Sequence, residues 1–449
     1  MSLVESQGPT SSSVTRLPSR PFPRPAGEGG GERASLALFD SDLCVKCNIC
    51  TAACPVAAVT DRFPGPKAVG PQMARFLRPG IPVDPSVAWC SGCGVCSRVC
   101  PHGVPVAEMN IISKAETRTG WLHNLRDWGL SRPAEIARWS RPVRPLVNAA
   151  LRSRLVRTAA DGIVGLARDA PLPQIAAESL RHHRADLARR TPGPSDAAAR
   201  PRVAFFHGCS TDGYEPWLGE TTIRVLERLG VEVEIPPQGC CGLPLQSNRN
   251  FAAARRYARR NLAGLHPWAE RGIPIVGTST SCTLALKHEY RAVLGLAGPE
   301  VEAVSETTFD VFEYLDQVLA DRVGALDLRP VLRRLLYHPP CQLRSHRIGT
   351  PALRILRRIP GLEIAVSAVE CCGVAGTYGL KREMHDVAVE VGADLFALAR
   401  QAAPDLIVTD SETCRWWIEH HTRIPARHPI EILAASLGLE NLRPASDLA

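Results

Sequence analysis

Two short stretches share a cysteine spacing that leaves few ways for the chain around them to fold. CVKCNICTAACP places Cys44, Cys47, Cys50 and Cys54 just before a proline, and CSGCGVCSRVCP repeats the spacing with Cys90, Cys93, Cys96 and Cys100. Thiolates at these intervals are ligands of [4Fe–4S] clusters, and in two-cluster modules the fourth cysteine of each run serves the other cluster. We therefore predict two [4Fe–4S] clusters in a small ferredoxin-like module of the α+β class.

Two ligand sets are expected, because the fourth cysteine of each run binds the cluster of the other run. One set is Cys44, Cys47, Cys50 and Cys100, and the other is Cys54, Cys90, Cys93 and Cys96. A pair of structural zinc sites is the alternative for four-thiol groups. The strict repetition of the run, including its terminal proline, favours iron–sulfur clusters.

The other eight cysteines form a second repeat in the C-terminal half of the chain. Each copy has a lone cysteine, a Cys-Cys-Gly triplet and a further lone cysteine. The copies are Cys209, Cys240, Cys241 and Cys282, then Cys341, Cys371, Cys372 and Cys414. Apolar runs such as RVAFFHGC and DLIVTDSETC end at cysteines and predict buried strands, and helical stretches separate them. This βαβαβα pattern predicts a small parallel sheet in each copy.

Parallel sheets bind ligands at the carboxyl ends of their strands. We expect the cysteines of each copy to gather at that edge as ligands of a further iron–sulfur centre. A zinc ion is the alternative, although adjacent cysteines point in different directions and suit a multi-iron cluster better. His207 and His338 precede the first cysteine of each copy, where either could donate a hydrogen bond to a cluster or act as an ordinary buried histidine.

Five segments are expected along the chain of 449 residues. They are an extension rich in glycine, proline and serine (1–37), the ferredoxin module (38–112), a basic helical linker (113–200) and the two cysteine-rich domains (201–325 and 326–440). The overall class is therefore α/β with a small α+β module. The N-terminal stretch has no apolar region typical of a secretory signal, and we find no transmembrane segment. Sixteen cysteines in such a chain indicate metal ligation more than disulfides.

The linker carries most of the positive charge of the chain. Residues 119–200 contain 14 arginines, no lysine and 7 acidic residues, with Trp121, Trp128 and Trp139 among the arginines. Tryptophan beside arginine on an amphipathic helix is typical of segments that lie on a membrane surface. Val147, Leu151, Leu155, Ile163 and Leu166 are expected on one side of a helix. Packing between the cluster domains, with a solvated basic face, is the alternative. No nucleic-acid partner is expected.

The stretches FPGPKAVGP, GIPIVGTSTSCTLALKHEY, ECCGVAGTYGLK and IVTDSETCRWWIE resemble the iron–sulfur subunit, designated C, of anaerobic glycerol-3-phosphate dehydrogenases. The Cys-Cys-Gly repeats also resemble the cysteine-rich CCG domain that occurs in heterodisulfide reductase, in its subunit designated B, and in the glycolate oxidase iron–sulfur subunit. The resemblance covers about residues 40 to 440. It implies an electron-transfer subunit that sits on the inner face of the cell membrane and passes electrons from a flavin-containing dehydrogenase subunit toward quinone.

The resemblance also implies that glycerol 3-phosphate is oxidised in the flavin subunit, so no catalytic residue is expected in this chain. A subunit of a glycolate or other 2-hydroxy-acid oxidase, and a thiol redox enzyme of the heterodisulfide reductase type, are the alternatives. Ser279 and Ser411 occupy the position where the full CCG motif has a further cysteine. With four cysteines in each copy, electron relay is favoured over disulfide chemistry.

Overall fold

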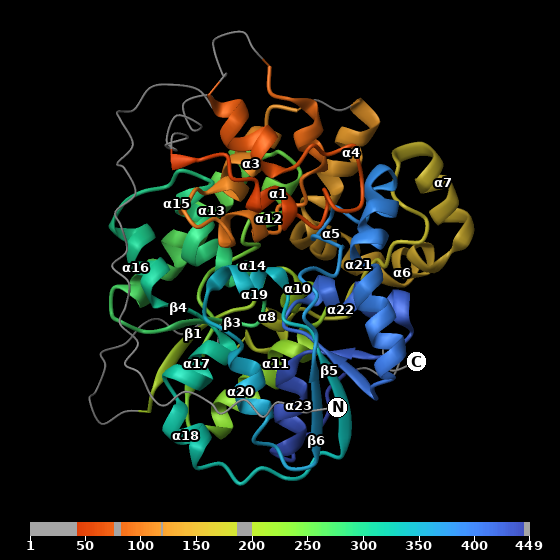
Figure 1. Cartoon of the computed structure of the whole chain (residues 1–449). Helices are drawn as coiled ribbons and strands as arrows, with labels where there is room; N and C mark the ends of the chain where they lie inside the picture. Colours follow the sequence, from red (N-terminus) through yellow and green to blue (C-terminus); the bar gives the residue numbers. More distant parts are fainter. Residues whose placement is uncertain (1–42, 76–81, 118–119, 186–199, 444–449) are drawn as a thin grey trace, which may run out of the picture.

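A computed structural model of the chain describes residues 43–75, 82–117, 120–185 and 200–443 (Figure 1). The expected extension over residues 1–37 lies outside these ranges. The ferredoxin module lies at one end of the molecule, and the two sheets lie at the other end. None of the helices in the described ranges is long and apolar enough to span a bilayer.

Short helices and turns make up the described part of the ferredoxin module. They are α1 (Ile49–Ala52), η3 (Ala68–Gln72), η4 (Pro85–Trp89), α2 (Val95–Arg98) and α3 (Val106–Lys114). Asn48 and Gly94 precede α1 and α2 with left-handed φ values of 70° and 80°. These turns bend each cysteine run back on itself. No strand occurs in residues 43–75 and 82–117, where an α+β module was expected.

The linker folds into several short helices. They are α4 (Trp121–Leu130), α5 (Pro133–Ser140), η5 (Arg141–Val143), α6 (Arg144–Arg152), α7 (Arg154–Val164) and α8 (Leu180–His183). A proline occupies one of the first two positions in α5, η5 and α6. The expected single helix over Val147 to Leu166 is wrong. Ser153 ends α6 in an extended conformation, and its hydroxyl caps α7 by accepting from the Val156 N–H at 3.5 Å.

The expected parallel sheet is present in each cysteine-rich repeat, with four strands instead of three. The first sheet contains β1 (Arg202–Phe206), β2 (Glu232–Glu234), β3 (Ile275–Gly277) and β4 (Thr308–Asp310) in the order β2-β1-β3-β4. The second contains β5 (Arg333–Tyr337), β6 (Leu362–Val366), β7 (Leu406–Val408) and β8 (Ala426–Arg427) in the equivalent order β6-β5-β7-β8. Val203 pairs with Val233 in one sheet, and Leu335 pairs with Ile364 in the other. The identical topology confirms the sequence repeat.

Helices connect these strands and cover both sheets. The first repeat holds α10 (Ser210–Gly213), α11 (Pro216–Arg228), α12 (Leu243–Ser247), α13 (Phe251–Ala269), α14 (Thr280–Leu284), η6 (Ala285–Glu289), α15 (Tyr290–Ala292), α16 (Pro299–Thr307), α17 (Val311–Gln317) and α18 (Ala320–Gly324). The second holds α19 (Cys341–His346), α20 (Pro351–Leu356), α21 (Arg382–Ala402), α22 (Glu412–Thr422) and α23 (Pro429–Ser436). The long helices α13 and α21 confirm two of the helical stretches expected between the strands.

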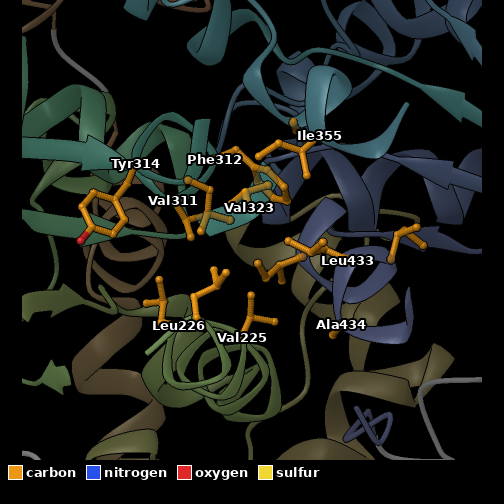
Figure 2. Close-up of a cluster of buried hydrophobic side chains, with 14 of the residues drawn as sticks. Val225, Leu226, Val311, Phe312, Tyr314, Val323, Ile355, Leu433 and Ala434 are labelled. Atoms are coloured by element: carbon orange, nitrogen blue, oxygen red, sulfur yellow. The ribbon is translucent and has the colours of Figure 1, made fainter. Parts of the chain in front are cut away.

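The two repeats share one hydrophobic core (Figure 2). Val225 and Leu226 of α11 and Phe312 of α17 come from the first repeat, whereas Ile355 of α20 and Leu433 of α23 come from the second. All five side chains are almost completely buried. Burial of a large aliphatic or aromatic side chain contributes roughly 1.5–3 kcal/mol. This core therefore fixes the two cysteine groups relative to each other.

Candidate metal centres

The first ferredoxin-type set lies close to the molecular surface. Cys47 is exposed, Cys44 and Cys100 are half-buried, and Cys50 is buried. Burial, and then the nearby thiols of Cys100 and Cys44, raise the pKa of Cys50. The structure thus brings Cys100 of the second run beside cysteines of the first run, as the crossed assignment expects.

The second ferredoxin-type set is buried. The exposed fraction of Cys54, Cys90, Cys93 and Cys96 is 8% at most. Burial, and then the thiols of Cys90, Cys93 and Cys54, raise the pKa of Cys96 well above its usual value. The Ala57 N–H donates to Cys54 Sγ at 3.5 Å, a contact that stabilises negative charge on sulfur. Cys54 therefore lies with the cysteines of the other run.

In the first cysteine-rich repeat, thiols from three loops meet beyond the carboxyl edge of the sheet. Cys209 follows β1 directly, and Cys282 lies in α14, just after β3. Cys241 Sγ lies 3.4 Å from Cys282 Sγ. The Cys240 thiol, through hydrogen bonds, and then the Cys282 thiol shift the pKa values of Cys209 and Cys241. All four expected cysteines are therefore neighbours.

The second repeat places its cysteines in the same way. Cys341 begins α19 after β5, and Cys414 lies in α22 after β7. Cys372 Sγ and Cys414 Sγ are 3.1 Å apart, and the Gly373 N–H donates to Cys371 Sγ at 3.4 Å. The stretch LEIAVSAVECCG predicts a buried strand that ends at the double cysteine, and this prediction is wrong. Strand β6 stops at Val366 and is an exposed edge strand, so the Cys-Cys pair lies in the loop beyond it.

Gly373 has a conformation and surroundings that only glycine fits. Its φ is +97°, and a Cβ at this position would lie 1.9 Å from the Ala388 carbonyl oxygen of α21. The glycine thus lets the Cys371–Cys372 loop run against the backbone of a long helix.

Gly373→Ala is expected to destabilise the second repeat by roughly 2–4 kcal/mol and to lower its metal content, because the helix or the thiol loop must move. Gly376→Ala is a matched control, since Gly376 also has a positive φ of +62° but nothing within 4 Å of its Cβ position. Thermal denaturation and metal analysis of both variants give the comparison. Equal stabilities for the two variants would contradict the proposed packing constraint.

The second ferredoxin-type set also contacts the second cysteine-rich repeat. Cys93 packs with Cys341 and Cys371 in one buried group. Burial, and then the thiol of Cys371, raise the pKa of Cys93. Arg98 of α2 forms an ion pair with Glu370, next to the double cysteine. This contact joins thiol sets that are far apart in the sequence, and no local pattern in the sequence indicates it.

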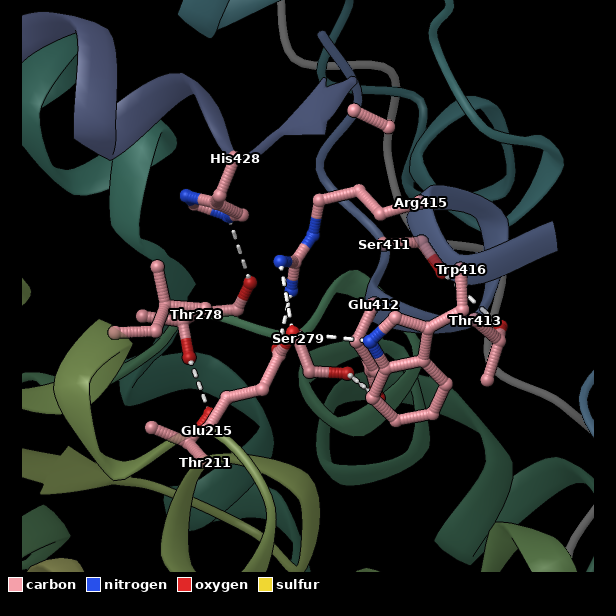
Figure 3. A network of polar contacts seen from close by, with 12 residues as sticks. Thr211, Glu215, Thr278, Ser279, Ser411, Glu412, Thr413, Arg415, Trp416 and His428 are labelled. Carbon is pink, nitrogen blue, oxygen red and sulfur yellow. Dashed lines mark hydrogen bonds and ion pairs between the residues drawn. The ribbon is translucent and has the colours of Figure 1, made fainter. Parts of the chain in front are cut away.

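A buried polar network joins the two repeats beside their thiols (Figure 3). Arg415 of α22 donates to both carboxylate oxygens of Glu215 at 3.1 and 2.7 Å, and Trp416 Nε1 donates to the same carboxylate at 2.9 Å. Ser279 donates to Glu412 Oε1 at 3.1 Å. Glu412 belongs to the second repeat, but its charge is one of the causes that raise the pKa values of Cys282 and Cys209 in the first repeat. Glu215, Glu412 and Arg415 were not among the site residues expected from the sequence.

The serines and histidines singled out from the sequence take different positions. Ser279 contacts Glu412, whereas Ser411 Oγ lies 3.4 Å from Thr413 Oγ1. His207 Nδ1 lies 2.6 Å from the Gly208 carbonyl oxygen. His338 is fully buried, and neither ring nitrogen has a hydrogen-bond partner among the described residues. Burial is the main cause that lowers the pKa of His338 to about 4, near the Cys371 thiol.

The donor chemistry of these sets fits iron–sulfur clusters. All sixteen cysteines lie in the described ranges, none is in a disulfide, and most are buried. Within those ranges, no three His, Cys, Asp or Glu side chains are arranged to hold a single metal ion. The identity of the metal group therefore follows from cysteine spacing and from comparison with known proteins.

Those comparisons agree with the architecture. Residues 40–104 match the 4Fe-4S dicluster domain family, and residues 203–287 and 335–419 match the cysteine-rich domain family. In Escherichia coli, the anaerobic glycerol-3-phosphate dehydrogenase subunit designated C is 34% identical over 399 residues, which cover 88% of this chain and 98% of that protein. The glycolate oxidase iron-sulfur subunit of the same species is 27% identical over 88% of this chain and 94% of its own length. In Methanothermobacter marburgensis, the fumarate reductase (CoM/CoB) subunit designated B is 25% identical over 84% of this chain and 67% of its own length.

The fold, the thiol sets and these matches define an iron–sulfur protein of the electron-transfer class, with [4Fe–4S] clusters in a dicluster module and two cysteine-rich domains. Such proteins work as subunits of multi-subunit oxidoreductases. Within this class, the chain belongs to the family of the anaerobic glycerol-3-phosphate dehydrogenase subunit designated C.

Proposed function

We propose that this chain accepts electrons from a flavin-containing dehydrogenase subunit that oxidises glycerol 3-phosphate, and passes them to quinone at the membrane. The observation that carries the proposal is a series of thiol sets, which runs from the exposed Cys47 to the buried cysteines of the two repeats. In this arrangement the protein side chains would bind the clusters, shield them from water and set their reduction potentials. Each cluster would carry one electron at a time. Substrate oxidation belongs to the partner subunit.

The proposed ligands follow the four observed groups. Cys44, Cys47, Cys50 and Cys100 hold one [4Fe–4S] cluster, and Cys54, Cys90, Cys93 and Cys96 hold the other. Cys209, Cys240, Cys241 and Cys282 hold a centre in the first repeat (201–325), and Cys341, Cys371, Cys372 and Cys414 hold a centre in the second (326–440). Packing of Cys93 against Cys341 and Cys371 supports electron transfer from the buried ferredoxin cluster to the second repeat.

The substrate of the partner is tested in the native complex. Pull-down of the chain from its own cells, followed by anaerobic assay with glycerol 3-phosphate and with glycolate, should show cluster reduction by glycerol 3-phosphate alone. Reduction by glycolate alone would instead favour the glycolate oxidase type, to which the 27% identity of that iron–sulfur subunit also points.

Exposed apolar side chains on the linker support docking of the chain on the inner face of the cell membrane. Leu146 is 73% exposed, Leu155 is 84% exposed and Ile163 is 63% exposed, with Trp121 and Trp139 also uncovered. Exposed arginines of α6 and α7 accompany these side chains, which is the composition of an interfacial segment. The surface proposed for docking therefore comprises α4, α5, α6 and α7.

The triple variant Leu146→Ser, Leu155→Ser, Ile163→Ser is expected to bind lipid vesicles at least about tenfold more weakly, because it removes apolar area that enters the bilayer surface. Co-sedimentation with vesicles that contain anionic lipid measures the effect.

Arg152→Gln with Arg154→Gln should weaken only the binding that depends on anionic lipid, by about 1 kcal/mol for each arginine. Arg157 is left unchanged because its guanidinium donates to the carbonyl oxygens of Arg168 and Leu151 and holds the loop after α7.

Unaltered vesicle binding by the triple variant at Leu146, Leu155 and Ile163 would rule out this surface as the docking site.

A further inference from the structure

One cavity lies where the ferredoxin module, the linker helices and both repeats meet. Its volume is about 520 Å³, which is in the range of small-molecule sites. Cysteines from three of the four thiol sets line it, among them Cys93, Cys282 and Cys371. Clusters held by these thiols would lie beside the rest of this space.

The linker that carries the proposed docking surface contributes an apolar arm to the lining of the cavity. The arm is lined by Leu125, Leu130, Val147, Leu151, Val164 and Leu166. Leu125 is exposed on α4, and Val147 and Leu151 share α6 with the exposed Leu146. The same short helices thus present apolar side chains outward to the solvent and inward to the cavity.

The charges around the cavity favour a neutral occupant. Four basic and four acidic side chains line it, so their formal charges cancel. Arg126, Arg249 and Lys381 all pair with Asp127, and Lys114 donates to the Cys90 carbonyl oxygen at 2.9 Å. These contacts leave little basic charge for a carboxylate or phosphate. A neighbouring cavity of about 1250 Å³ is lined by seven arginines and is a clear contrast.

Four buried polar side chains nevertheless line the cavity with atoms that have no hydrogen-bond partner among the described residues. They are Ser210 Oγ, Gln246 Nε2 and Oε1, Glu289 Oε2 and the Tyr378 hydroxyl. The exposed fraction of each of these residues is 7% at most. Buried polar atoms normally have partners, so unpaired donors around an apolar space indicate a ligand with carbonyl or hydroxyl oxygens, or a cluster sulfur.

We infer that the apolar arm of this cavity is the site where a lipophilic quinone is reduced. The inference rests on the proposed function and adds the site to it. A quinone combines an apolar ring and tail with two carbonyl oxygens, which matches the apolar lining, the balanced charge and the unpaired donors Gln246 and Tyr378.

Reduction of one quinone to a quinol takes two electrons and two protons and breaks both C=O double bonds to C–OH. The electrons come one at a time from the reduced iron–sulfur centres beside the cavity, which are oxidised in turn. Glu289 supplies one proton, and water that reaches the cavity supplies the other and then reprotonates Glu289. Burial raises the pKa of Glu289 to about 7, so a useful fraction of this carboxyl group is protonated at neutral pH.

The test uses the full chain with its clusters, reduced by dithionite, so that no partner subunit or substrate is involved. Reoxidation is followed by absorbance with a short-chain ubiquinone and, separately, with ferricyanide, which is charged and needs no apolar site. Leu151→Trp fills the arm, and Leu332→Trp is the matched control, because Leu332 is 79% exposed and lies outside the linker. Tyr378→Phe removes one unpaired hydroxyl group with little change in shape.

Leu151→Trp is expected to raise the quinone concentration for half-maximal rate at least about tenfold, and Tyr378→Phe a few-fold, while ferricyanide rates and iron content stay unchanged. Leu332→Trp should behave as the unmodified chain. Wild-type quinone kinetics in both Leu151→Trp and Tyr378→Phe would overturn the site and leave the proposed function intact. An unmodified chain that ferricyanide oxidises but quinone does not would overturn quinone as the acceptor.

Discussion

Cys54→Ala is expected to remove the same [4Fe–4S] cluster as Cys93→Ala, although Cys54 belongs to the first cysteine run. The expectation follows from the buried group of Cys54, Cys90, Cys93 and Cys96, in which three neighbouring thiols act on Cys96. Loss of one thiolate should release about four iron atoms per chain. It should also slow electron transfer from the dithionite-reduced surface cluster to quinone by at least about a hundredfold, since even weaker changes around metal ligands cost 10- to 100-fold.

Iron analysis and low-temperature EPR of the reduced proteins distinguish the two clusters. Cys54→Ala and Cys93→Ala should retain one common spectrum, that of the surface cluster, whereas Cys47→Ala and Cys100→Ala should retain the other. Cys282→Ala is the control, because it removes a ligand of the first repeat and should leave both ferredoxin spectra in place. If Cys54→Ala instead matches Cys47→Ala, the clusters are held within single runs and the crossed assignment is wrong.

Local sequence patterns were sufficient to predict the elements that place the thiols. The spacing within each run predicted which cysteines share a turn, and the repeat of Cys209, Cys241 and Cys282 predicted two copies of one parallel sheet. Apolar periodicity identified α13 and α21, because long helices with one buried face leave a strong signal. Strands β4 and β8 were missed because, unlike the other short strands, they are not followed by a cysteine motif that marks their ends.

Contacts between distant segments could not be predicted, because a pattern identifies a buried face but not the partner that covers it. Nothing near Cys93 indicates Cys371, and nothing near Glu215 indicates Arg415. The same limit applies to the linker, because its sequence does not show which apolar side chains are covered by other segments. Val147 and Leu151 line the central cavity, whereas Leu155 and Ile163 are exposed, because the break at Ser153 turns α7 away from the line of α6.

The position of Ser279 and Glu412 also changes how the two repeats are understood. Sequence comparison of the repeats treats each as holding its own centre. The structure instead places a carboxylate of the second repeat against the thiols of the first, through the hydrogen bond between Ser279 and Glu412. Each centre therefore has surroundings that depend on how the repeats pack, so the two are expected to differ in reduction potential despite equal cysteine spacing.

Arg415→Met is expected to lower the free energy of unfolding by about 3–5 kcal/mol, because it leaves the Glu215 carboxylate buried without its counter-charge. Arg415 is 1% exposed, and Glu215 also accepts from Trp416, so water cannot replace the lost guanidinium easily. The loss should fall on the junction of the repeats, since Glu215 precedes α11 and Arg415 lies in α22. Denaturant midpoints, followed by tryptophan fluorescence and by cluster absorbance under anaerobic conditions, measure the change.

Arg354→Met is the matched control, because Arg354 also holds a carboxylate with two nitrogens, that of Asp316, but is 49% exposed. An exposed pair contributes about 0–1 kcal/mol, so this variant should remain near the parent protein. The double variant Glu215→Gln, Arg415→Met should regain much of the loss, since no buried charge is left alone. Equal effects of Arg415→Met and Arg354→Met would show that the Glu215–Arg415 pair does not hold the repeats together. If Arg415→Met loses cluster absorbance at a lower denaturant concentration than native fluorescence, unfolding begins beside Ser279 and Cys282, where the network reaches the thiols.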